Sequence, residues 1–178
     1  MHAQQWALLS VMAAGGAGVI WSYIHGFGTH PGSAETLWGG VSGWLRQFNY
    51  ATMILAALGY FGFTYWLLFR VDPATVTVFG GAGYWMFFVI FVVILVPSAL
   101  WMPLLFQYLA QPGTGQWTAI RVVLILVGIG SLALLAAILT VSPRETGTAY
   151  WLAVGGAAAF CVQTAVLDML VWPELFRD

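Results

Sequence analysis

The stretch that decides the fold is GYWMFFVIFVVILVPSALWMPLLFQYL, residues 83–109, which is apolar almost throughout and long enough to cross a bilayer. Pro97 and Pro103 interrupt it, and each removes a backbone hydrogen-bond donor from the expected helix. In lipid, the freed carbonyl groups need partners on neighbouring helices, side chains or a ligand. We therefore expect the rest of the chain to pack around this helix, with a pocket against residues 97–106. A kinked core helix without a ligand explains the two prolines equally well.

The overall composition is that of an integral membrane protein. Of the 178 residues, 61% are hydrophobic and 6% are charged, whereas about a quarter of the residues in a soluble domain are charged. The formal net charge of −1 gives no indication of nucleic-acid binding. The single cysteine, Cys161, lies in an apolar run and is expected to be a small buried residue.

Five apolar segments are each close to the roughly 20 residues that a transmembrane helix needs. They predict an all-α, multi-pass bundle of five transmembrane helices in one domain over residues 1–178, with the termini on opposite sides of an unidentified membrane. Arginines are expected on both sides, so the positive-inside rule does not fix the orientation: Arg46, Arg121 and Arg177 on one, Arg70 and Arg144 on the other. The expected spans are residues 6–24, 49–69, 84–109, 118–141 and 149–172.

The connection over residues 25–48 is long and rich in glycine. Within residues 35–46 the apolar side chains recur at roughly helical spacing, which predicts a short amphipathic helix. Such a helix either lies in the membrane interface or folds over a pocket as a lid. Its apolar residues are Leu37, Trp38, Val41, Trp44 and Leu45.

Few residues point to catalysis. His25 and His30 flank the glycine-rich turn, but no third ligand lies nearby in sequence, so we expect solvated histidines and no metal site. No Ser-His-Asp order, phosphate loop or H-E-x-x-H motif is present, so hydrolytic and metal-dependent catalysis have no support. Asp168 is the only acidic residue inside a span. A carboxylate there costs about 2.5 kcal/mol or more, which makes Asp168 a candidate ligand contact or a hydrogen-bonded structural residue.

The aromatic side chains and five short motifs carry the remaining information. Tyr60, Trp66, Trp85, Phe88, Trp101, Phe106 and Phe160 are expected either to face a common cavity or to form ordinary core. The motifs, in chain order, are SYIHGFG (22–28), AALGYFGFTYWLLF (56–69), SALWMPLLF (98–106), TVSPRE (140–145) and AFCVQTAVLDMLVW (159–172).

Taken together and in this order, the motifs resemble the tryptophan-rich sensory protein and translocator protein family. Its members are small five-helix membrane proteins that bind porphyrins and, in some cases, sterols or synthetic ligands. SALWMPLLF is similar to the family's third-helix signature, in which an asparagine is followed by Trp-x-Pro and an aromatic pair. The family's first-loop signature with its prolines is absent, and Trp38 and Trp44 stand in its place. Ser98 and Asp168 stand where the family has asparagines, and Phe160 where it has a tryptophan.

The resemblance implies a pocket between helices that binds a flat hydrophobic molecule such as porphyrin, haem or a sterol. No cofactor is required, and the only enzymatic activity it implies is photo-oxidative breakdown of porphyrin. It also implies a homodimer in the lipid bilayer. The implied lining consists of Tyr60, Ser98, Trp101, Phe106, Phe160, Thr164 and Asp168, with Trp38 and Trp44 as a cap.

Two other functions stay open. In the first, the chain is a small structural subunit of a larger membrane complex. Small residues let helices approach closely in lipid, so the clusters at residues 13–18, 128–131 and 155–159 would be docking surfaces. In the second, Asp168 serves a proton-coupled enzyme or transporter, although no partner base accompanies it and no internal repeat is visible.

Overall fold

The computed structural model describes residues 1–176 and contains five helical segments long and apolar enough to cross a membrane. The chain is an all-α, integral, multi-pass membrane protein, as the composition predicts. Of the arginines assigned to the two sides, Arg177 lies outside the described residues. The segments are α1 (Ala3–Thr29), α2 (Gly43–Phe69), α3 (Trp85–Ala110), α4 (Thr114–Thr140) and a continuous run of α5 (Thr148–Cys161), η2 (Val162–Val171) and α6 (Trp172–Phe176).

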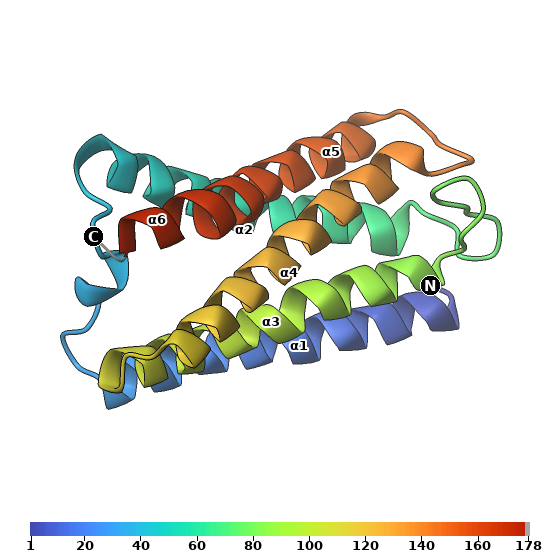
Figure 1. Ribbon diagram of the computed structural model, residues 1–178. Helices are drawn as coiled ribbons and strands as arrows, with labels where there is room; N and C mark the ends of the chain where they lie inside the picture. The colour runs from blue at the N-terminus through green and yellow to red at the C-terminus, as the bar shows by residue number, and fades with distance from the viewer. Residues whose placement is uncertain (177–178) are drawn as a thin grey trace.

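The five segments form two layers with one helix between them. Helices α1 and α3 lie side by side in one layer, and α2 packs on α5 in the other (Figure 1). Helix α4 crosses between the layers and contacts α3, α5 and η2. Helix α1 packs on α3 and barely touches α2, although the two are consecutive in the sequence.

The central helix is α4, and our expectation that the chain packs around residues 83–109 is wrong in this respect. Half of the most apolar window of α4 is buried (50%), against 39% for α3. Helix α3 carries the prolines and the motif that distinguish its sequence. One of its sides nevertheless faces lipid, with Val89, Val92 and Val96 exposed. Helix α4 also has an exposed side, with Val122, Ile129 and Leu132. It is central because it contacts helices of both layers.

Glycines allow the closest helix contacts. A Cβ added at Gly130 of α4 would lie 2.7 Å from the Ile94 side chain of α3. A Cβ at Gly128, on the same helix, would lie 2.6 Å from the sulfur of Met169 on η2. In lipid, helices associate through such close packing and not through the hydrophobic effect. These two glycines therefore hold the layers together through α4.

The connection between α1 and α2 differs from the expected loop 25–48 with a helix over 35–46. Helix α1 continues to Thr29 and α2 begins at Gly43, so the connection spans only 30–42. Within it, one 3₁₀ turn, η1 (Thr36–Trp38), ends at Gly39, where φ is +54°. A Cβ there would lie 2.7 Å from the Cα of Phe176. The contact with α6 therefore breaks the amphipathic pattern into a turn and the first turn of α2.

The same connection folds over one end of the bundle. This resembles the second of the two arrangements that we expected for residues 35–46, a lid. Leu37 and Val41 are buried, and the Gly40 amide donates a hydrogen bond to the Leu175 carbonyl oxygen at 2.8 Å. The indole of Trp172 donates to the Leu37 carbonyl oxygen at 2.9 Å. These bonds fix residues 37–41 against α6.

A close backbone-to-backbone contact between two helices predicts a stability effect. A Cβ on Gly59 of α2 would lie 2.6 Å from both the Cα and the carbonyl oxygen of Gly156 on α5. We expect Gly59→Ala to lower the free energy of unfolding by about 1–3 kcal/mol, because backbone cannot move aside as a flexible side chain can. Thermal unfolding in detergent measures the effect.

Gly155→Ala is the matched control, because a Cβ at Gly155 meets no atom within 4 Å. It should unfold like the wild type. Equal midpoints for Gly59→Ala and Gly155→Ala would contradict the close contact between α2 and α5.

Candidate functional site

The two layers meet around the indole of Trp101 on α3. Its ring lies 5.9 Å from that of Tyr23 on α1 and 5.8 Å from that of Trp172 on α6, measured between centroids. Trp172 in turn stacks on Phe176 at 4.4 Å and on Trp117 of α4 at 6.2 Å. Aromatic side chains of α1 and α6 therefore contact the position that the sequence motif singles out, and Trp117 of α4 joins the cluster through Trp172.

The Trp101 indole nitrogen is buried and has no hydrogen-bond acceptor among residues 1–176. A buried N–H donor without a partner costs about 1–3 kcal/mol, and such groups are rare in native proteins. Only one other buried side-chain polar atom in this part of the chain has no partner, the hydroxyl of Thr64 on α2. The unpaired indole marks a place where an acceptor on a bound molecule would be stabilised.

A buried polar network lies on η2 and α2. The Gln163 amide nitrogen donates to Oδ1 of Asp168 at 2.8 Å and to Oδ1 of Asn49 at 3.0 Å. The Gln163 amide oxygen accepts a hydrogen bond from the Thr52 hydroxyl at 2.6 Å. One glutamine thus satisfies three polar groups inside the membrane, where water is not available to them.

The π-helical geometry of η2 makes this network possible. In an α-helix, at 3.6 residues per turn, positions five apart lie about 140° apart around the axis. Backbone hydrogen bonds from residue i to i+5 bring such positions onto the same side, and π segments are frequent at functional sites. Gln163 and Asp168 are five apart and bonded. Steps of four residues, which place side chains on one side of an α-helix, therefore do not predict this pair in η2.

Asp168 is positioned by neutral groups. No arginine or histidine of residues 1–176 forms an ion pair with it. Its carboxyl is within electrostatic range of the Tyr23 hydroxyl on α1. Asp168 therefore lies near both the Gln163 network and Tyr23.

The hydroxyls of two other expected contacts bond to their own helix. Ser98 donates to the Ile94 carbonyl oxygen at 2.7 Å, and Thr164 donates to the Phe160 carbonyl oxygen at 2.8 Å. Both hydroxyls thus have intrahelical partners, as serine and threonine commonly do in membrane helices. Neither is an unpaired donor comparable to Trp101.

Phe106 belongs to the end of the bundle that residues 30–42 cover. His30 stacks on its ring at 4.0 Å between centroids, and a Cβ on Gly26 would lie 2.7 Å from it. His25 stacks on Trp21 at 6.1 Å. Among residues 1–176 no three His, Cys, Asp or Glu side chains are grouped to hold a metal ion.

The two tryptophans of the expected cap behave differently. Trp38 contacts Tyr50 at 4.8 Å, and the Arg46 guanidinium lies 5.0 Å from its ring centroid. Trp44 is 76% exposed and covers nothing in the bundle. Its expected role as a cap is wrong, because the chain enters α2 at Gly43 and leaves Trp44 on the outer side.

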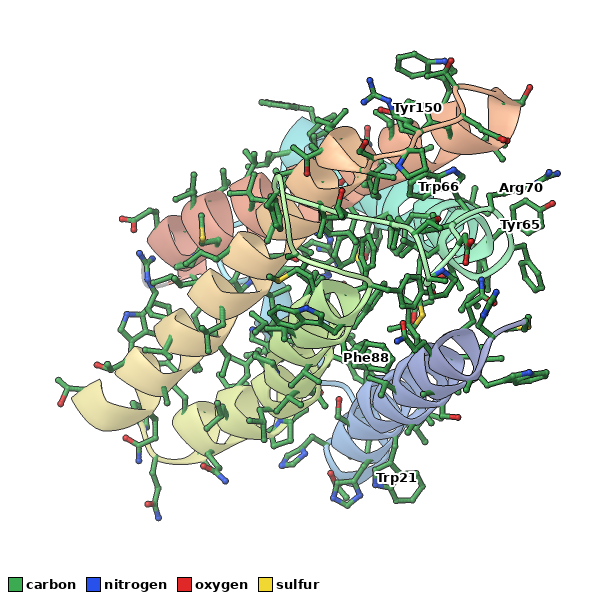
Figure 2. All side chains as sticks on the ribbon, turned by 90° about the vertical axis from the view of Figure 1, so that its right-hand side faces the viewer. Trp21, Tyr65, Trp66, Arg70, Phe88 and Tyr150 are labelled. Atoms are coloured by element: carbon green, nitrogen blue, oxygen red, sulfur yellow. The ribbon has the colours of Figure 1, made fainter. Side chains whose placement is uncertain are left out.

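The other aromatic residues do not share one cavity. Tyr60 and Phe160 pack around Phe63 in the middle of the bundle, at 5.3 and 5.9 Å. Trp66 packs on Tyr150 at the end of the bundle that faces the viewer in Figure 2. Trp85 is 56% exposed. Of the expected aromatic lining, only Trp101 and Phe106 lie at the end of the bundle covered by residues 30–42.

Comparison with known protein families, with curated proteins and with solved structures finds no match to this chain. The assignment of the candidate site therefore depends only on the geometry described above.

Sequence reasoning missed Tyr23 and Trp172 as neighbours of Trp101, and Asn49, Thr52 and Gln163 as the support of Asp168. A signal existed for the second group, because Asn49 and Gln163 are amides inside apolar segments. Their pairing joins residues 114 positions apart, which only the packing of α2 on α5 and η2 brings together.

We expect Gln163→Leu to lower the free energy of unfolding by about 1–3 kcal/mol, because it leaves Asp168 and Asn49 buried without their shared partner. Unfolding in detergent with increasing sodium dodecyl sulfate measures this. Gln107→Leu on the exposed side of α3 is the matched control. Equal stability of the two variants would show that the network does not support the site.

A second prediction concerns the pKa of Glu35 and the stability of the protein at acidic pH. Arg46 donates two hydrogen bonds of 2.7 Å to Glu35 and thereby holds the pKa of the Glu35 carboxyl below its ordinary value of 4.5. Because the folded pKa is lowered, the stabilisation is present at neutral pH and is lost as pH falls below 4.5 and through the folded pKa.

Carbon-13 NMR of labelled glutamate measures this directly. Glu35 should titrate below 4.5 in the wild type and return toward that value in Arg46→Gln. Arg121→Gln, which removes the corresponding bond to Glu174, should leave Glu35 unchanged. An unshifted Glu35 in the wild type would contradict the pairing.

Proposed function

We propose that the protein binds a flat, hydrophobic molecule that carries a hydrogen-bond acceptor, in the space between α1, α3 and η2, and that it is a divergent relative of the translocator proteins. The ligand class is a tetrapyrrole such as porphyrin or haem, with sterol-like molecules as the neighbouring class. The proposal requires no resident cofactor or metal. Photo-oxidative breakdown of the bound porphyrin is the one reaction that it accommodates.

The observation that carries the proposal is the unpaired indole N–H of Trp101. It lies between the rings of Tyr23 and Trp172, so a planar ligand would meet aromatic faces and one hydrogen-bond donor together. Ligand sites between helices are typically of this kind, mostly apolar with a few polar groups that fix the orientation.

The polar groups that differ from the family pattern define what the ligand must offer. The Ser98 hydroxyl is engaged by Ile94, and the Asp168 carboxyl by Gln163. Trp101 is left as the donor, and the free oxygen of Asp168 as an acceptor. A tetrapyrrole offers a partner for Trp101, because it carries carboxylate acceptors at its edge.

The alternative, a small subunit of a larger complex, has less support. The small residues of α4 and part of those of α5 pack inside the bundle, since Gly128 and Gly130 face η2 and α3, and Gly156 faces α2. The cluster at residues 13–18 is less enclosed, with Ala13, Ala14 and Ala17 exposed. Gly16 on α1 and Gly155 on α5 still face open space. A partner that copurifies in fixed ratio and stays bound to Trp101→Ala would favour this alternative.

The test is a titration of the detergent-purified protein with protoporphyrin and with haem, read as a saturable shift of the porphyrin absorption band. Trp101→Phe keeps an aromatic ring and removes the N–H. We expect its Kd to rise roughly five- to thirtyfold, because one buried hydrogen bond worth about 1–2 kcal/mol is lost.

Trp151→Phe is the matched control, because Trp151 is 61% exposed and begins α5 at the other end of the bundle. It should bind like the wild type. The absence of a saturable shift in the wild type, or an equal Kd for the Trp101→Phe protein, would overturn the proposal.

A further inference from the structure

A second candidate site lies at the other end of the bundle, independent of the ligand proposed above. A cavity of about 500 Å³ is formed by the end of α2, the chain that follows it, the loop before α5 and the first turn of α5. Trp66, Arg70 and Tyr150 from this end are labelled in Figure 2. Its volume is in the range of small-molecule sites.

The loops that wall the cavity are tied to each other. Thr77 and Ser142 exchange two backbone hydrogen bonds, at 2.8 and 2.9 Å, and the Phe79 amide donates to the Thr140 hydroxyl at 3.1 Å. Asp72 is fixed in its turn by the Ala74 amide at 3.0 Å. The cavity is therefore formed by a linked pair of loops.

The helix ends that line the cavity offer hydrogen-bond donors. Tyr150 is 2% exposed, and its hydroxyl oxygen accepts from Arg144 at 3.1 Å, so the hydroxyl proton is left to donate elsewhere. Trp66 also lines the cavity, and its indole N–H donates no hydrogen bond within residues 1–176. Arg70, which is exposed and lies against the ring of Tyr65, adds a positive charge to the lining. These groups favour a bound anion with several acceptor oxygens.

The loops that line the cavity carry the opposite charge. Asp72 and Glu145 both line the cavity from the loops that follow α2 and precede α5. Asp72 lies 3.5 Å from Nε2 of His2, and Glu145 forms no ion pair among residues 1–176. The lining thus combines donors from the helix ends with carboxylates from the loops.

We propose that this cavity binds the headgroup of a membrane phospholipid that ends in a primary ammonium, as phosphatidylethanolamine does. In such a lipid the phosphate lies between the acyl chains and the amine. The phosphate would then meet Tyr150, Trp66 and Arg70, while the ammonium donates to Glu145 and Asp72. A headgroup without an amine leaves the carboxylates facing a phosphate, and a trimethylated amine cannot donate to them.

Native mass spectrometry of the detergent-purified protein tests this, with an equimolar mixture of phosphatidylethanolamine, phosphatidylcholine and phosphatidylglycerol of the same acyl chains. We expect at least fivefold more phosphatidylethanolamine than either other lipid on the wild type. Glu145→Gln should reduce its excess over phosphatidylglycerol, and Arg70→Gln should weaken retention of all three.

Glu174→Gln and Arg121→Gln are the matched controls, because both residues are charged and paired at the opposite end of the bundle. They should retain lipid like the wild type. Equal retention of the three lipids, or retention that Glu145→Gln and Arg70→Gln leave unchanged, would overturn the proposal. Binding of free phosphoethanolamine as tight as that of the lipid would overturn its assignment to a membrane lipid.

Both substituted residues are exposed, and an unchanged thermal midpoint would show that the fold is retained. The porphyrin titration of the same variants separates the two sites, since Arg70 and Glu145 lie at the end of the bundle away from Trp101.

Discussion

The absence of water from the hydrocarbon core of the membrane is the constraint on which the structure depends. Every backbone polar group there must be satisfied inside the chain, so the apolar segments become helices, and these helices gain nothing from hiding apolar surface from lipid. They associate where backbones can approach closely. Gly128 and Gly130 on α4 and the pair Gly59 and Gly156 between α2 and α5 are among the positions at which a single added Cβ would collide. The layered arrangement follows from these contacts.

The same constraint explains why the polar residues are informative. In water an unpaired amide or indole is solvated, whereas within the bundle it costs free energy unless it forms a hydrogen bond inside the protein. Gln163 forms hydrogen bonds with Asp168, Asn49 and Thr52 at once. The Trp101 indole forms none and stays unpaired between aromatic rings. A satisfied network beside an unsatisfied donor is the arrangement expected of a rigid support next to a ligand position.

The two ends of the bundle differ in chemistry. At one end, residues 37–41 pack on α6, and stacked rings of Trp172 and Phe176 close the space between the layers. At the other, two linked loops leave a cavity lined by donors from the helix ends and by carboxylates from the loops. An apolar, aromatic end and a charged end suit different parts of amphiphilic molecules, since the first excludes water and the second meets it.

The sequence by itself determined the fold class and the number of spans, because the hydropathy and length of a segment are local properties that decide whether it can cross a bilayer. It also marked Trp101 and Asp168 as unusual within apolar segments. Only the tertiary structure decided which helix is central. The small residues of α4 matter because they let α3 and η2 approach it closely, and this is seen only once those helices pack on it. The tertiary structure decided the partners of Asp168, because the i to i+5 geometry of η2 and the contact with α2 cannot be counted in α-helical steps. It also decided that Trp44 stays outside and Trp38 does not, because the position of α6 against Gly39 sets where the connection turns.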